Sequence, residues 1–286
     1  MTMPAMPARL TSLRSFLFAP ASHRGRAERA LASTAHAAIL DLEDAVASRE
    51  KPHAREIAES LLPYRRGLQE AAGPARLLRI NAIGTPFFAE DLALVERVDL
   101  DAVVMPKASV AALESLPDAF PPVYALIESA AGLREAFVLA SSPRVACLML
   151  GAVDLAADLG LTPQPDGAEL LLARSQLVCD SRAANALAPI DGVWTQLEDI
   201  AGLEREATRA RALGLRGKLC IHPRQVEVVN AAFAPDEQER DWARRTLEAY
   251  DFALARGEGA IVVDGELVDL AVVARARRLL GEAAPA

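Results

Sequence analysis

Polar and charged residues recur directly after short apolar runs in this sequence, and the segment ILDLEDAV is the densest case. It places Asp41, Glu43 and Asp44 behind an apolar stretch, and comparable runs lead to Glu128 in ALIES and Asp154 in LMLGAVD. Carboxylate oxygens without histidine or cysteine beside them suit Mg²⁺, which one or two carboxylates plus the substrate usually hold. We therefore predict that Glu128 and Asp154 bind magnesium.

Each of these acids also has a simpler alternative role. Glu128 and Asp154 could instead cap helices or pair with lysines and arginines nearby. Asp41 and Glu43 are expected to orient metal-bound water or substrate, while Asp44 is the acid most suited to capping the following helix. We favour the metal because two isolated acids at matching positions are less expected by chance than one.

Basic residues follow further apolar runs. Arg79, in ARLLRIN, offers a planar fork for a carboxylate, and Lys107, in VVMPK, offers a point charge. Together with Mg²⁺ they predict an anionic substrate, although pairing with the neighbouring acids is an equal alternative for Lys107. His222 could contact a carrier or only hydrogen-bond locally, and we expect a structural role for it and for Lys218.

The elements that must position these residues are eight β-rich runs separated by helix-compatible segments. This alternation predicts a (β/α)8 TIM barrel over residues 12–232, whose active site would lie where the strands end. An open doubly wound sheet is the alternative, but the glycine-rich loop of a nucleotide site is missing from the sequence. The expected strands are 15–20, 37–44, 75–81, 101–107, 122–129, 145–154, 189–195 and 217–223.

Residues 233–286 are expected to form a C-terminal helix–hairpin–helix extension. A capped amphipathic helix is predicted at about 236–256, a hairpin in IVVDGELVD and a last helix through Leu280. Such a segment is too small for an independent core. It should therefore pack on the barrel or on a neighbouring subunit.

Composition excludes several classes of protein. The 286 residues are 52% hydrophobic and carry a net charge of -8, which fits a large packed core and argues against nucleic-acid binding. Three widely spaced cysteines predict neither a disulfide framework nor a metal site and favour a reducing compartment. We find no leader-like segment and no apolar run of about 20 residues, so we expect a cytoplasmic protein without a membrane partner.

Eight motifs carry a resemblance to a known family, and they extend from about Arg14 to Leu280. In their order, they resemble the citrate lyase β-subunit (CitE)-like branch of the HpcH/HpaI aldolase superfamily. The resemblance implies a TIM barrel, a homo-oligomer (trimer or hexamer), Mg²⁺ on Glu128 and Asp154, and a CoA or acyl-carrier thioester as part of the substrate. The motifs are RSFLFAP, ILDLEDAV, LRINAIGTPFFAEDL, VVMPKAS, ALIESAAGL, LMLGAVDLAADLG, GKLCIHP and DGELVDLAVVARARRLL.

The resemblance also implies residue roles. Arg79 would hold the oxo-acid, and Arg26 lies in a loop that touches the thioester carrier in relatives. From the residues themselves we expect Asp41 and Glu43 in the catalytic set and Lys107 and Arg14 to bind substrate. Asp269, in LVDLAVV, matches an acid/base that relatives supply from the adjacent subunit. The N-terminal motif keeps Arg26 but has alanine and serine where the family has glycine and asparagine, which leaves open whether the carrier is CoA or a protein.

The implied function is a magnesium-dependent carbon–carbon lyase. It would cleave a malyl-, citramalyl- or citryl-type CoA thioester to an oxo-acid and acetyl-CoA, or catalyse the reverse condensation. Alternatives are a citrate lyase β subunit that works only in an acyl-carrier complex, a malyl-CoA thioesterase, and an aldolase acting on CoA-free oxo-acids. The sequence does not distinguish oxaloacetate, pyruvate and glyoxylate as the oxo-acid.

Overall fold

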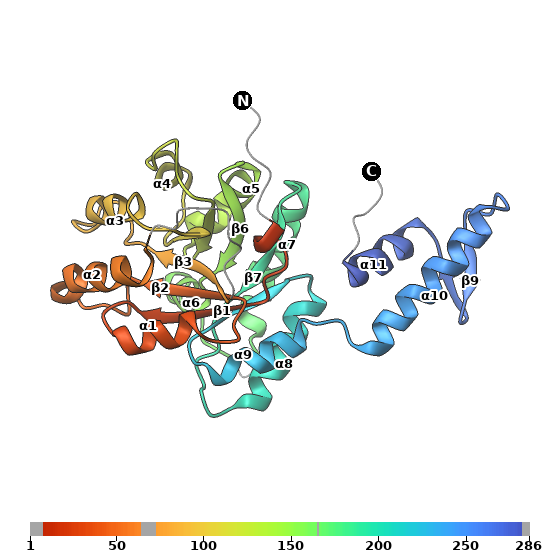
Figure 1. The fold of residues 1–286 in the computed structure, drawn as a ribbon. Helices are drawn as coiled ribbons and strands as arrows, with labels where there is room; N and C mark the ends of the chain where they lie inside the picture. The colour runs from red at the N-terminus through yellow and green to blue at the C-terminus, as the bar shows by residue number, and fades with distance from the viewer. Residues whose placement is uncertain (1–7, 64–72, 165, 282–286) are drawn as a thin grey trace. The chain divides into compact units, whose positions relative to one another are not determined.

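The computed structural model describes residues 8–63, 73–164 and 166–281. The chain forms two compact units, Met1–Phe233 and Ala234–Ala286. Eight parallel strands of the first unit close into a barrel in chain order, and β8 pairs with β1. The predicted (β/α)8 TIM barrel is therefore confirmed, and Figure 1 shows the barrel strands with helices around them.

The strands and helices of the barrel unit alternate along the chain. The strands are β1 (Ser15–Pro20), β2 (Ala37–Asp41), β3 (Ala75–Arg79), β4 (Ala102–Met105), β5 (Val123–Ile127), β6 (Val145–Leu150), β7 (Leu187–Asp191) and β8 (Gly217–Cys220). The helices are α1 (Arg24–Leu31), α2 (Lys51–Leu61), α3 (Phe88–Val95), α4 (Val110–Glu114), α5 (Ala130–Ser141), α6 (Ala152–Asp158), α7 (Leu171–Ala183), α8 (Ile200–Ala212) and α9 (Arg224–Ala232). Short 3-10 turns lie at Ala8–Leu10, Ser48–Glu50 and Ala168–Leu170.

Alternate strand residues supply two apolar layers. One fills the barrel with side chains such as Phe16, Ile39 and Leu77, and the other, with Leu40 and Leu78, packs beneath the helices. Because strand side chains point alternately to opposite faces, Asp41 and Arg79 share the inward side of Ile39 and Leu77. Asp41 and Arg79 therefore lie inside the barrel at the carboxyl ends of their strands, directly beyond the apolar layer that fills it.

All strands after β1 end earlier than predicted, and the local cause is visible at β2 and β6. β2 ends at Asp41 because its carboxylate accepts hydrogen bonds from the N–H groups of Glu43 and Ala45, which turns the chain. β6 ends at Leu150, and α6 begins directly after Gly151, so that Asp154 lies in the first helical turn. The predicted ranges 37–44 and 145–154 therefore extended too far, and those of the other strands after β1 extended two to four residues too far.

The second unit has the predicted helix–hairpin–helix order. A capping box of Asp236 and Glu239 starts α10 (Glu237–Leu254), and α11 (Leu270–Leu280) follows the hairpin. The hairpin pairs β9 (Ile261–Val263) with β10 (Glu266–Val268). Its turn residues, Asp264 and Gly265, have φ values of 51° and 86°, as a type I′ turn requires. In the described part of the chain, no helix has the length and apolarity needed to cross a bilayer.

Candidate active site at the carboxyl ends of the strands

A cavity of about 210 Å³ opens at the carboxyl ends of the barrel strands. Five residues predicted from the sequence line it together: Asp41, Asp44, Arg79, Glu128 and Asp154. The remaining wall is mostly apolar. It consists of Phe18, Ala45, Leu126, Leu150, Gly151, Ala152, Val153, Val193, Leu219 and Ile221.

Arg79, the last residue of β3, is held by acids at the end of β2 and on the loop that follows it. Its Nε and Nη2 each donate to the carboxylate of Asp41 at 2.7 Å. Its Nη1 lies 3.0 Å from Glu43 and 3.5 Å from Asp44, and Phe18 covers the guanidinium at 4.9 Å. Burial lowers the pKa of Arg79, but Asp41 and the other acids outweigh it and raise that pKa, so the cation persists. Asp41 therefore fixes the plane of a permanently charged fork.

Glu43 is a buried carboxyl in contact with Arg79. The residue is 6% exposed. Burial raises its pKa to about 8, and the charges of Asp44 and Glu128 add to this effect while Arg79 opposes it. Its Oε2 makes the ion contact with Arg79 but no aligned hydrogen bond. Glu43 can consequently carry a proton at neutral pH.

Glu128 directly follows β5, and its carboxylate has the chemistry of a cation ligand. The residue is 4% exposed; its Oε1 accepts the N–H of Lys107, while its buried Oε2 has no hydrogen-bond partner. Burial raises the pKa of Glu128 to about 7, the Lys107 N–H lowers it, and the nearby charge of Asp154 raises it. An unpaired buried carboxylate oxygen is costly, and a hard cation would satisfy it.

Gly151 leaves room for this carboxylate. A Cβ atom at position 151 would lie 2.5 Å from the Cβ and 3.0 Å from the Oε2 of Glu128. Among the described residues, no three or more histidine, cysteine or acidic side chains form a metal-ligand group. Mg²⁺ usually needs only one or two carboxylates besides water and substrate, so Glu128 and Asp154 fit this ion.

Lys107 contributes through its main chain. Its φ of 46° is in the left-handed region, uncommon for a residue with a side chain, and its N–H points to Glu128. Its side chain is exposed. The sequence predicted that Lys107 acts through the charge of its side chain. A main-chain hydrogen bond to Glu128 could not be predicted, because any residue type except proline has the same N–H group.

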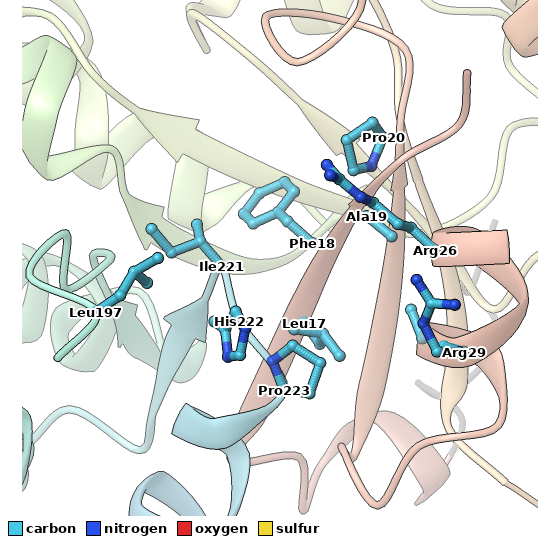
Figure 2. A pocket seen from close by; sticks show the side chains of 11 residues that line it. Leu17, Phe18, Ala19, Pro20, Arg26, Arg29, Leu197, Ile221, His222 and Pro223 are labelled. Carbon is cyan, nitrogen blue, oxygen red and sulfur yellow. The ribbon is translucent and has the colours of Figure 1, made fainter. Parts of the chain in front are cut away.

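A second cavity, of about 420 Å³, shares Phe18 and Ile221 with the first. Figure 2 shows Arg26 and Arg29 on one side of it and Leu197 and Ile221 on the other. Its lining is Leu17, Phe18, Ala19, Pro20, Arg26, Arg29, Ala30, Leu197, Ile221, His222 and Pro223. His222 thus lines a cavity, and its Nδ1 also accepts the N–H of Arg224. Sequence reasoning found Arg26 but missed Arg29 and Leu197, which only the fold brings near it.

Three predicted residues lie elsewhere or act differently. Arg14 precedes β1, lies about 20 Å from the site at the usual rise of that six-residue strand, and lines neither cavity. Asp44 caps neither of the next helical segments, whose caps are Ala47 and Glu50, and it contacts Arg79 instead. Asp269 belongs to the second unit, where its carboxylate caps α11.

Lys218 has the structural role expected for it. The residue is fully buried, and its Nζ lies 2.6 Å from both Asp191 and Glu206. Arg174 joins the same acids from α7. This network fixes β7 and β8 against the helices, outside the cavities described above.

The sequence of this chain is similar to those of known proteins. Residues 14–223 match the family model HpcH/HpaI aldolase/citrate lyase. The chain belongs to this family. It is 35% identical to a (3S)-malyl-CoA thioesterase of Cereibacter sphaeroides, over 94% of each chain. It is also 35% identical to the citrate lyase subunit beta of Leuconostoc mesenteroides, over 93% of this chain and 92% of the relative.

A solved relative shares the fold at high similarity. It is the protein CitE from Mycobacterium tuberculosis, in complex with magnesium, acetoacetate and coenzyme A. The match has a TM-score of 0.80 and 34% identity, and it covers 95% of this chain and 98% of that one. The predicted CitE-like relationship is thereby confirmed.

Proposed function

We propose that this protein is a magnesium-dependent carbon–carbon lyase acting on a β-hydroxy acyl-CoA. The main observation behind this proposal is that the buried Oε2 of Glu128 has no hydrogen-bond partner. Glu128 lines one cavity together with Asp154 and Arg79. Relatives named citrate lyase subunit beta, and a CitE complexed with magnesium and coenzyme A, support this assignment.

In the proposed reaction, the substrate hydroxyl lies at Glu128 and Asp154, and the carboxylate of the oxo-acid half lies at Arg79. In the cleavage direction the hydroxyl loses its proton, the bond between the carbinol carbon and the thioester α-carbon breaks, and its electron pair forms the thioester enolate. Mg²⁺ on Glu128 and Asp154 would acidify the hydroxyl and polarise the carbonyl that replaces it. Arg79 binds the carboxylate of the resulting oxo-acid, which replaces its 3.5 Å contact with Asp44.

Two carboxyl groups handle the protons. We assign the hydroxyl proton to the ionised form of Glu43, whose pKa of about 8 lies near neutral pH, so that the carboxyl can both accept and return a proton there. We assign protonation of the enolate carbon to Asp269, which converts the enolate into acetyl-CoA. In the condensing direction Asp269 removes a proton from the same carbon. Asp41 orients Arg79 throughout.

The second cavity is suited to the CoA portion. Arg26 and Arg29 can pair with its phosphates, while Leu197 and Ile221 offer apolar surface for the pantetheine chain. Because Phe18 and Ile221 line both cavities, a thioester in one can reach the metal site in the other. Lys107, exposed beside Glu128, remains a proposed substrate contact.

A thioesterase is the second candidate, because several relatives at about this identity are named (3S)-malyl-CoA thioesterase. Water would then attack the thioester carbonyl, and the carbon–carbon bond would stay intact. A citrate lyase β subunit that requires a carrier protein is the remaining alternative. All three use the same metal site.

Purified protein should be given malyl-CoA, citramalyl-CoA and citryl-CoA, with and without Mg²⁺, while free thiol and oxo-acid are measured. We expect Mg²⁺-dependent release of oxo-acid without free thiol. Thiol without oxo-acid would establish a thioesterase, and activity only with an acyl-carrier thioester would establish the carrier-dependent subunit. The variants Glu128→Ala and Asp154→Ala should each abolish turnover with the fold intact; full activity in either would refute the metal pair.

A further inference from the structure

A buried lysine lies directly behind the candidate active site. Lys51 opens α2, is 6% exposed, and extends its ammonium group beneath the loop that follows β2. Its Nζ donates to the carbonyl oxygens of Leu42 at 2.8 Å and Glu43 at 3.0 Å, and to Oδ1 of Asn81 at 2.6 Å. Phe87 covers it at 5.1 Å.

Asn81 extends this contact to α3. Its Nδ2 donates to Leu42 at 3.0 Å and to Asp91 at 2.6 Å, and its main-chain N–H also donates to Asp91. Arg55, from α2, donates to the other oxygen of Asp91 at 2.7 Å. The network therefore joins the loop after β2, the segment after β3, and the two helices that cover them.

These are the two segments that present the Arg79 cluster. Asp41 and Glu43 lie on the first, and Arg79 lies two residues before Asn81 on the second. Leu42 belongs to the outer apolar layer, whereas Glu43 contacts Arg79. Lys51 thus fixes, from outside the barrel, the peptide groups that aim Glu43 at Arg79.

Burying the charged side chain of Lys51 costs folding free energy that a purely structural residue would not need to cost. Burial lowers its pKa, and the charges of Asp41 and other acids oppose this effect. All three of its hydrogen-bond acceptors are uncharged. Burying a cation against neutral acceptors is expensive, and apolar packing of similar volume is often more stable. A role in orienting the charged site explains why a lysine occupies this position.

We propose that Lys51 is a positioning residue that fixes the orientation of Arg79 through the Leu42–Glu43 loop and Asn81. The inference rests on the proposed function in one respect, that Arg79 binds the carboxylate of the oxo-acid. Lys51 itself touches no substrate. Its loss should therefore weaken binding of the oxo-acid while binding of CoA in the second cavity is unchanged.

The test compares Lys51→Met with a control from the same network, Arg55→Met, which removes donors to Asp91 and α3 but none to the Leu42–Glu43 loop. Calorimetric titration with oxaloacetate, pyruvate and glyoxylate in Mg²⁺, and separately with CoA, gives the affinities. We expect Lys51→Met to weaken oxo-acid binding about tenfold, as loss of charge-assisted hydrogen bonds implies, with CoA binding unchanged. Arg55→Met should lower only the melting temperature.

A second readout is independent of any ligand. In the free protein, the NMR signal of the Arg79 Nε–H, identified by its loss in Arg79→Lys, should shift in Lys51→Met and not in Arg55→Met. Lys51→Arg, which keeps a charged donor, should recover part of the oxo-acid affinity. If Lys51→Met does not fold, Lys51→Gln replaces it, with a smaller weakening expected.

The outcomes separate the two proposals. Unchanged oxo-acid affinity and an unshifted Arg79 signal in Lys51→Met would overturn the role of Lys51. Equal effects of Lys51→Met and Arg55→Met would also overturn it, because they would indicate general loss of structure. If the unaltered protein binds none of the three oxo-acids, the proposed function fails, and the Arg79 signal alone then decides the role of Lys51.

Discussion

Glu43 and Glu128 have raised pKa values at the same rim, and this couples metal binding to pH. Both pKa values rise from an ordinary 4.5, to about 8 and about 7, because burial disfavours the ionised carboxylates. A raised carboxyl pKa means that the folded protein binds protons more tightly than the unfolded chain does. The metal-free protein should therefore lose stability as the pH rises from about 4.5 toward 8.

Mg²⁺ should reverse this loss. The ion needs ionised ligands, so protons compete with it below about pH 7, where Glu128 takes one up. We expect Mg²⁺ to bind more tightly and to raise the melting temperature more at pH 8 than at pH 6, measured by calorimetry. In Glu128→Gln the increase should be small at both pH values; an equal increase at pH 6 and pH 8 in the unaltered protein would contradict the assignment.

Gly151 gives a second prediction at the scale of single residues. Gly151→Ala would place a methyl group 2.5 Å from the Cβ of Glu128, so that the carboxylate must move. Because a displacement of about 1 Å can cost on the order of 100-fold in rate, we expect at least a tenfold loss of Mg²⁺ affinity and turnover. Gly259→Ala, whose Cβ would meet nothing within 4 Å, is the control. Equal Mg²⁺ affinity in the two variants would show that Glu128 is not confined as described.

At the scale of elements, the sequence predicted where strands begin better than where they end. Eight apolar runs, with Ser15–Pro20 matched in full, were enough to infer the barrel because parallel strands buried on both faces are continuously apolar. The ends of β2 to β8 were all overestimated, most clearly at β2 and β6, since the turn at Asp41 and the helix start after Gly151 depend on local hydrogen bonds.

The candidate site was predictable where a side chain follows a strand on its inward side. Asp41, Arg79 and Glu128 satisfy that condition and line one cavity. Arg14 does not, because it precedes its strand. The main-chain contact of Lys107 and the buried donors of Lys51 depend on residues 21 and 30 positions away, and no local pattern encodes them.

The helix start at Asp269 allows its capping of α11 to be separated from its proposed proton transfer. Its carboxylate accepts the N–H groups of Ala271 and Val272, and asparagine caps helices about as well as aspartate but cannot transfer a proton in the same way. Asp269→Asn should lower kcat about 10²- to 10⁴-fold with an almost unchanged melting temperature, whereas Asp269→Ala should also destabilise α11 by about 1 kcal/mol. Turnover near normal in Asp269→Asn would remove this residue from the mechanism.

At the scale of the whole molecule, the C-terminal unit is poorly supplied with its own core. Among its described residues, 234–281, the buried apolar cluster consists of Tyr250, Val268 and Val273. It exposes more large apolar side chains than it buries, among them Phe252, Leu254, Val262, Leu267 and Leu270. Such a unit is expected to pack on another surface, and we propose a neighbouring subunit of a homo-oligomer.

Mixing two inactive variants tests this proposal. Glu128→Ala should lack the metal site and Asp269→Asn the proton donor. If each site takes Asp269 from its neighbour, subunits of the two variants exchanged into one oligomer should regain a fraction of normal turnover. Sedimentation should first establish that the protein is an oligomer. No recovery after proven subunit exchange, or a monomer in solution, would indicate that Asp269 does not act on a neighbour's site.

The left-handed backbone at Lys107 has a consequence for sequence variation in related proteins. The contact to Glu128 needs a main-chain N–H in a conformation with φ of 46°, and it needs no particular side chain. Glycine and asparagine adopt that conformation most readily, while proline can neither adopt it nor donate. The main-chain contact to Glu128 should therefore survive replacement of Lys107 by glycine or asparagine and be lost with proline, whereas the proposed substrate contact requires the lysine side chain.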